Sequence, residues 1–240
     1  MSIIRVRFAR GEEVKFISHL DLMKAFERTL RRMGLPVAYS QGFNPHPQMV
    51  FGLPLPVGVT SEAEYADFEL SRDYDPSEFM EKLNAGLPRG LFILDAKLWQ
   101  ARGNIMASIA GAEYTIMVFL TEALEPDKFA GAVARFLEKT SVIVKKEGKA
   151  GVKDVDIRPL ILKLEAVPET RKPPGYEEFG SAFRLKAVLR AGSSANLRPE
   201  LLATALSGES GLGFKACRMH RSGLFVEKGG RFADPMDEVV

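Results

Sequence analysis

The apolar residues in the N-terminal half of the chain recur with two different periods. Over residues 3–10 they alternate with arginine, and this period of two predicts a β-strand. Over residues 18–33 they recur every three or four positions, which predicts an amphipathic helix that stops before Gly34 and Pro36. Similar patterns predict a second helix at residues 76–85 and strands at residues 37–40, 49–55, 63–71 and 91–100. The order is β-α-β-β-α-β, with an extra extended segment in the middle.

The C-terminal half repeats this order of elements. Helical periodicity marks residues 126–139 and 198–206, a β-hairpin is expected at residues 142–156, and further strands are expected at residues 114–120, 160–167, 182–190 and 215–226. Two successive split β-α-β units favour an α+β fold, namely a tandem ferredoxin-like (βαββαβ) duplication with antiparallel sheets. We expect an N-terminal domain at residues 1–104, a C-terminal domain at residues 105–228 and a flexible tail at residues 229–240.

Composition narrows the classes of protein that this sequence can encode. With 240 residues, 46% hydrophobic and 27% charged, the chain is typical of a globular protein. A single cysteine, Cys217, excludes a disulfide framework, an iron–sulfur cluster and a Cys-rich zinc site. With only three histidines we expect no metal site, and nothing indicates a cofactor. No targeting peptide and no run of 18 apolar residues is present, so we expect a cytoplasmic protein without membrane contact.

The formal net charge is only +2, so any basic surface that binds nucleic acid must be local. Basic residues gather on the first strand, on the first helix and on the predicted hairpin. These residues are Arg5 and Arg7; Lys24, Arg28, Arg31 and Arg32; and Lys145, Lys146, Lys149 and Lys153. They are candidates to grip RNA phosphates, although such runs also occur on ordinary solvated faces. The aromatic pattern of an RNA-recognition motif is absent.

The first helix opens with a candidate acid/base residue. Ser18 is expected to cap the helix, with Asp21 reaching back to the Ser18 amide. His19 then occupies the first helical position, beside unpaired amides that attract anions. A general acid/base or phosphate-binding role for His19 therefore stands beside the alternative of a surface residue at a helix start.

Two loops add further candidates. The segment from Tyr39 to Pro47 offers Tyr39, Gln41, Asn44 and His46 as groups that could surround a base or small ligand. The alternative is a rigid, proline-fixed connection whose polar groups satisfy their own backbone. The second loop, residues 208–213, contains Gly211 and Gly213, whose amides could approach a phosphate; a flexible turn explains it equally well.

Residues 16–22 (FISHLDL), 39–47 (YSQGFNPHP) and 53–62 (LPLPVGVTSE) resemble a bacterial family known as the radical SAM-linked proteins. That family is an uncharacterised domain found next to, or fused behind, a radical S-adenosylmethionine (SAM) protein, often near genes for ribonuclease E/G and ribosomal proteins. The resemblance implies a radical SAM partner and an RNA or ribosome context, and it supplies no catalytic residues.

A looser likeness, of architecture only, is to CRISPR RNA-processing endonucleases of the RAMP superfamily. By position alone it makes His19 the acid/base, and Gly208, Gly211 and Gly213 a phosphate loop. A likeness of fold does not establish function.

Three hypotheses follow from these patterns. The first is an RNA-binding accessory module that works with a radical SAM enzyme in tRNA or rRNA modification or processing. The second is a metal-independent RNA endonuclease in which His19 is the general acid/base. The third is a protein-interaction subunit that docks a radical SAM partner. Because the chain has one cysteine, any radical SAM cluster must belong to that partner.

Overall fold

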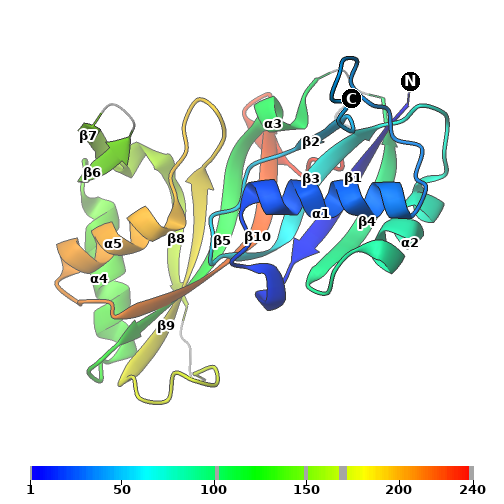
Figure 1. Ribbon diagram of the computed structural model, residues 1–240. Coiled ribbons are helices and arrows are strands. Elements are labelled where there is room, and N and C mark those ends of the chain that lie inside the picture. The colour runs from blue at the N-terminus through cyan, green and yellow to red at the C-terminus, as the bar shows by residue number, and fades with distance from the viewer. Residues whose placement is uncertain (1, 101–102, 149–150, 168–171, 238–240) are drawn as a thin grey trace. The chain divides into compact units, whose positions relative to one another are not determined.

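A computed structural model describes residues 2–100, 103–148, 151–167 and 172–237 (Figure 1). The chain divides into two compact units. The first contains residues 1–110 together with residues 221–240, and the second contains residues 111–220. We describe each unit by itself.

The first unit follows the element order that the sequence predicts. It contains β1 (Ile3–Arg10), α1 (His19–Arg32), β2 (Met49–Phe51), β3 (Thr60–Glu69), α2 (Pro76–Gly86), β4 (Leu91–Trp99) and the short helix α3 (Ile105–Ser108). A 3₁₀ turn, Glu12–Val14, precedes α1. β1 pairs antiparallel with both β3 and β4, and β2 pairs antiparallel with β3.

Two predicted strands of the first unit are shorter than expected. Residues 37–40 make only isolated bridges, and β2 ends at Phe51. Pro54 and Pro56 follow shortly after β2, and proline has no backbone N–H to donate to a neighbouring strand. The path to β3 is therefore irregular.

Helices α1 and α2 cover one face of this sheet (Figure 1). α1 begins where the Ser18 hydroxyl accepts a hydrogen bond from the Asp21 amide, and it is followed by Gly34 with φ +62°. Phe26 is fully buried, and its ring centroid lies 5.2 Å from that of Phe8 and 5.3 Å from that of Phe51. An aromatic cluster therefore joins α1 to the sheet.

The C-terminal segment belongs to the first unit rather than to a frayed end. β11 (Arg231–Ala233) pairs with the end of β10 (Ala216–Lys228), and Met236 is buried. The Tyr65 hydroxyl lies 3.0 Å from both carboxylate oxygens of Asp234. Residues 229–237, which the sequence assigns to a flexible tail, therefore pair and pack; residues 238–240 lie outside the described residues.

The second unit contains the rest of the elements. They are most of β5 (Ile109–Leu120), then α4 (Pro126–Glu138), β6 (Ile143–Gly148), β7 (Gly151–Asp156), a 3₁₀ turn (Arg158–Leu160), β8 (Ile161–Val167), β9 (Ser181–Arg190), α5 (Pro199–Ser210) and the start of β10. β9 pairs antiparallel with β5 and β8, while β6 and β7 form a separate hairpin. The predicted hairpin is thus confirmed.

In the first unit the hydrogen-bonded strands follow the order β4-β1-β3-β10, with β2 paired to β3 and β11 paired to β10; in the second unit they follow the order β10-β5-β9-β8. The strand β10 runs through both units. Eleven strands and five α-helices in the described part of the chain confirm the predicted α+β class. None of the described helices has the length and apolar character needed to cross a bilayer.

Candidate functional site

The start of α1 places a half-buried imidazole against an aromatic ring. His19 is the first residue of α1, and its ring meets the Phe51 ring edge-on, with centroids 5.6 Å apart. Burial lowers the pKa of His19 below its usual value, and the positive charge of Arg10 lowers it further. The imidazole is therefore neutral at neutral pH, which is the form that a general base requires.

A buried group of charges lies close to His19. Arg221 is fully buried; its Nη1 donates to Glu64 Oε1 at 2.9 Å and to the Leu53 carbonyl at 2.9 Å. Arg10, 1% exposed, donates from Nε to the Val14 carbonyl at 3.2 Å. Burial raises the pKa of Glu64 and lowers that of Arg10. Two guanidinium groups thus share one carboxylate, and they anchor the segments before α1 and after β2.

This buried group is absent from the residues that the sequence predicts to be functional, although the sequence pattern contains a signal for it. Glu64, Ala66 and Phe68 alternate along β3, and their partners Phe8, Val6 and Ile4 on β1 are all buried. A charged residue on the strand face that otherwise carries buried apolar side chains indicates a charge that is buried and paired.

Exposed apolar side chains surround the start of α1. Phe16 is 72% exposed and Leu20 is 66% exposed, and Val57 is exposed as well. The Lys15 ammonium lies 5.1 Å from the Phe16 ring centroid, and the Gly58 amide donates to the Lys15 carbonyl. An aromatic face with a neighbouring cation is a suitable surface for an unstacked base or for a partner protein.

The loop before β2 satisfies part of its own backbone. The Ser40 amide donates to the His46 carbonyl at 2.9 Å, and the His46 amide donates to the Ser40 hydroxyl at 3.0 Å. Nδ2 of Asn44 lies 3.2 Å from Nε2 of His46. Gln41, Asn44 and His46 are exposed, as is Tyr39 at 38%. The loop is therefore self-bonded, and it also presents these four side chains to solvent.

The two arginines of β1 are engaged inside the protein. Arg5 is 3% exposed, its Nε and Nη2 donate to the two Asp67 oxygens, its Nη1 donates to the Pro235 carbonyl, and its guanidinium lies 3.5 Å from the Trp99 ring centroid. Each of its three nitrogen atoms donates to an internal partner, which argues against a role for Arg5 in RNA binding. Arg7, which is half-buried, donates to the Glu62 carbonyl.

The basic residues of α1 stay at the surface. Lys24 and Arg28 are exposed, and the part of the chain that the structure describes offers them no ion-pair partner within bonding distance. Arg31 pairs with Glu27 at 3.4 Å, and Arg32 donates to the Gly86 carbonyl. Lys24, Arg28 and Arg31 recur at helical spacing and form a basic stripe on α1.

The hairpin of the second unit sets two lysines directly opposite each other. Lys146 on β6 pairs in register with Lys153 on β7, and both are exposed. Lys145 faces Asp154 in the same ladder. Lys149 lies outside the described residues.

The backbone conformation at positions 211 and 213 explains why both residues are glycine. Gly211 ends α5 with φ +69° and Gly213 has φ +61°, conformations that favour glycine. The C-terminus of a helix carries carbonyl oxygens and the negative end of the helix dipole. This arrangement does not favour phosphate, so it argues against the phosphate-loop interpretation of Gly208, Gly211 and Gly213.

Solved structures share this fold at low sequence identity. A crystal structure of a Cbf5–Nop10–Gar1 complex matches with a TM-score of 0.52 and 11% identity over 92% of this chain and 47% of that chain. An archaeal box H/ACA sRNP Nop10–Cbf5 complex matches with a TM-score of 0.46 and 12% identity over 92% and 46%. The chain therefore spans about half the length of these two chains, and the match with a TM-score of 0.52 shows a likeness of fold.

No curated protein matches this sequence significantly. A family model does, and it matches residues 4–199, which include α1, α2, the loop before β2 and the lysine hairpin. The chain therefore belongs to DUF2344, a family described as an uncharacterized protein conserved in bacteria.

Proposed function

We propose that this protein is an RNA-binding accessory module that works with a radical SAM enzyme in the modification or processing of tRNA or rRNA. The observation that carries the RNA-binding part is the Lys146–Lys153 pair. Like charges directly opposite each other in an antiparallel ladder are destabilising, typically by some tenths of a kcal/mol. Neither lysine has an anionic partner among the described residues. Phosphate groups bound across the pair would relieve the repulsion.

The first unit offers a second surface for the same ligand. Lys24, Arg28 and Arg31 form the basic stripe of α1, and Phe16 is an exposed ring beside a lysine. Recognition of single-stranded RNA has two components: cationic side chains that follow the RNA backbone, and aromatic rings that stack on the bases. We assign Tyr39, Gln41, Asn44 and His46 to base contacts.

The experiment is RNA binding across a salt series. We expect log K to fall linearly with log salt, and the variant Lys146→Gln/Lys153→Gln to make the slope shallower by about 1.4, because two phosphate contacts are lost. The matched control is Lys163→Gln/Lys186→Gln, which removes the same charge from exposed lysines of β8 and β9. No binding at low salt, or equal slopes for the two double variants, would refute RNA binding through the hairpin.

The radical SAM partnership is supported by the sequence resemblance, and the exposed Phe16, Leu20 and Val57 offer a docking surface for that partner. Co-expression with the radical SAM protein encoded beside the gene tests it. We expect co-purification that Leu20→Ser weakens. A complex that survives Leu20→Ser would place the contact elsewhere, and the absence of any complex would refute the partnership.

A second candidate is a metal-independent RNA endonuclease. The neutral, half-buried imidazole of His19 at a helix start favours it. Incubation of structured RNA with EDTA should give cleavage that His19→Ala abolishes. Equal cleavage by the parent and His19→Ala would exclude this role.

We also propose that each unit is a ferredoxin-like half, as the sequence predicts. In the first unit β1 lies between β4 and β3, and β2 pairs with β3. In the second, β5 lies between β10 and β9, and β8 pairs with β9. This repeated strand order supports the duplication. An experimental structure without the β2–β3 or β8–β9 pairing would contradict it.

A further inference from the structure

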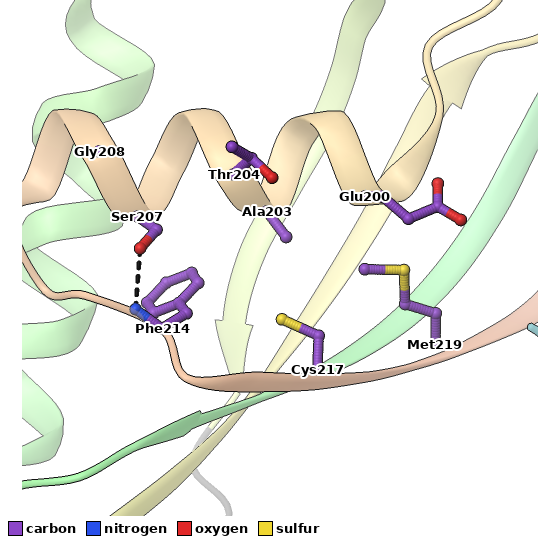
Figure 2. Close-up of a pocket in the computed structure, with 8 residues that line it drawn as sticks. All are labelled: Glu200, Ala203, Thr204, Ser207, Gly208, Phe214, Cys217 and Met219. Carbon is purple, nitrogen blue, oxygen red and sulfur yellow. Dashed lines mark hydrogen bonds between the residues drawn. The ribbon is translucent and has the colours of Figure 1, made fainter. Parts of the chain in front are cut away.

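The second unit contains a cavity of about 490 Å³ between α5 and the start of β10. Figure 2 shows its lining: the residues of α5 lie on one side, and Phe214 and the strand residues lie on the other. This volume lies within the range of small-ligand pockets. The lining residues are Glu200, Ala203, Thr204, Ser207, Gly208, Phe214, Cys217 and Met219.

The sequence explains why this space is open. Glu200, Ala203, Thr204 and Ser207 recur at three- and four-residue intervals, so they share one face of α5. Opposite them, Cys217 and Met219 alternate along β10 and point to the same side. Ala203, Ser207 and Gly208 are too small to fill the gap between helix and strand.

Glu200 is the polar group that this cavity leaves unsatisfied. Its Oε2 is buried and makes no hydrogen bond, and no ion pair joins Glu200 to any other described residue. A buried carboxylate oxygen without a donor is costly. Glu200 lies in the first turn of α5, where the positive end of the helix dipole interacts favourably with an acceptor of hydrogen bonds. A ligand that supplies N–H donors would satisfy it.

The rest of the lining suits a flat, partly apolar ligand. Phe214 is half-buried, and its ring centroid lies 6.2 Å from that of Phe129, which supports it from behind. The Ser207 hydroxyl accepts a hydrogen bond from the Phe214 amide at 2.8 Å, as drawn in Figure 2, and its own proton remains to be donated. Glu200 and Ser207 are seven residues apart, or about 10 Å along the helix. This length accommodates a base together with its sugar.

We propose that this cavity binds an unpaired guanine base, with Glu200 accepting hydrogen bonds from N1–H and the N2 amino group. Guanine alone among the RNA bases presents two adjacent N–H donors that match the two oxygens of a carboxylate. Adenine and cytosine present one amino group beside an acceptor nitrogen, which would face the second oxygen. The inference rests on the proposed RNA binding and specifies which base the second unit reads.

Cys217 provides a built-in reporter, because it is the single cysteine of the chain and it lines the cavity. Desolvation raises the pKa of its thiol to about 11, so alkylation is measured in alkaline buffer. We expect guanosine to slow the alkylation of Cys217 in a saturable way. Adenosine and 1-methylguanosine, which lacks the N1 proton, should not slow it.

Variants of Glu200 test the contact itself. Glu200→Gln keeps the size of the side chain, and it should weaken guanosine protection about tenfold or more, because a charged acceptor is lost. The control is Glu209→Gln on the same helix, since Glu209 pairs with Lys139 and does not line the cavity. Two results would overturn the proposal: guanosine protects Cys217 equally in the two variants, or adenosine protects it as well as guanosine does. A folding defect would explain neither.

Failure of this inference is distinguishable from failure of RNA binding. RNA that binds in the salt series while guanosine leaves Cys217 unprotected would refute the cavity alone. Guanosine protection without RNA binding would refute the proposed function and leave a nucleoside site.

Discussion

The buried group of Arg10, Glu64 and Arg221 allows a quantitative prediction. We consider Glu64→Leu, which removes the carboxylate and leaves both guanidinium groups buried. Breaking a buried ion pair by removing one partner costs about 3–5 kcal/mol, because the remaining charge has no counter-ion. The Leu53 and Pro54 carbonyls still accept from Arg221, so we expect the lower part of that range.

A double variant distinguishes the interaction energy between Glu64 and Arg221 from the other effects of each substitution. Glu64→Leu/Arg221→Met removes both charges, and we expect it to cost less than the sum of the two single variants, with a coupling of about 2 kcal/mol. The surface pair Glu12–Lys15, with Glu12 about half exposed, is the control; Glu12→Gln should cost about 0.5 kcal/mol or less.

The assay is urea unfolding followed by tryptophan fluorescence. Trp99 is the single tryptophan of the chain, and it lies under the Arg5 guanidinium in the first unit. Its emission therefore reports the unit that contains Glu64. A cost below about 1 kcal/mol for Glu64→Leu, or strictly additive costs in the double variant, would show that this pair is not a buried ionic contact.

Four further outcomes are expected. His19 has a lowered pKa in the folded state, so its share of stability is complete above its usual pKa of 6.5 and is lost as the pH falls below it; urea midpoints of His19→Gln should fall less on acidification than those of the parent. Gly180→Ala should lower the melting temperature, because a Cβ would lie 2.4 Å from the Glu122 carbonyl carbon, with a cost of about 1–3 kcal/mol. Gly131→Ala in α4, where the added Cβ meets only the end of the Arg135 side chain, should instead raise the melting temperature, with a gain in stability of about 0.5–1 kcal/mol. If the two substitutions shift the melting temperature in the same direction, the packing argument is wrong. Lys146→Gln alone should raise hydrogen-exchange protection in the hairpin by up to about 1 kcal/mol, and unchanged protection would contradict the repulsion between Lys146 and Lys153.

Arg5 shows where reasoning from the sequence failed. Alternation places Arg5 on the face of β1 opposite Ile4, Val6 and Phe8, but this face is covered as well, and Arg5 is buried. Its actual partners are Asp67, Trp99 and Pro235, which are between 62 and 230 residues away. No local period carries information about such distant partners, so the sequence pattern does not distinguish a buried, ion-paired arginine from one that contacts phosphate.

The cavity beside Glu200 was missed for a related reason. The sequence predicts α5 only to Leu206, but the helix continues to Ser210 and ends at Gly211. This extension places Ser207 and Gly208 on the face that meets β10. A pocket arises from the space between two elements, and the spacing of residues within one element does not reveal it.

Most of the secondary structure of this protein follows from signals that are local in the sequence: apolar periods, the Ser18 and Asp75 caps, and proline or glycine at helix ends. The sequence also determined the α+β class through the order of elements. The folded protein was needed to show that residues 221–237 pack with the first unit, that Arg5, Glu64 and Arg221 are buried, and that Glu200 lines a cavity. These features depend on contacts between residues distant in the chain, whose free energy is set by burial and charge pairing after the elements have assembled.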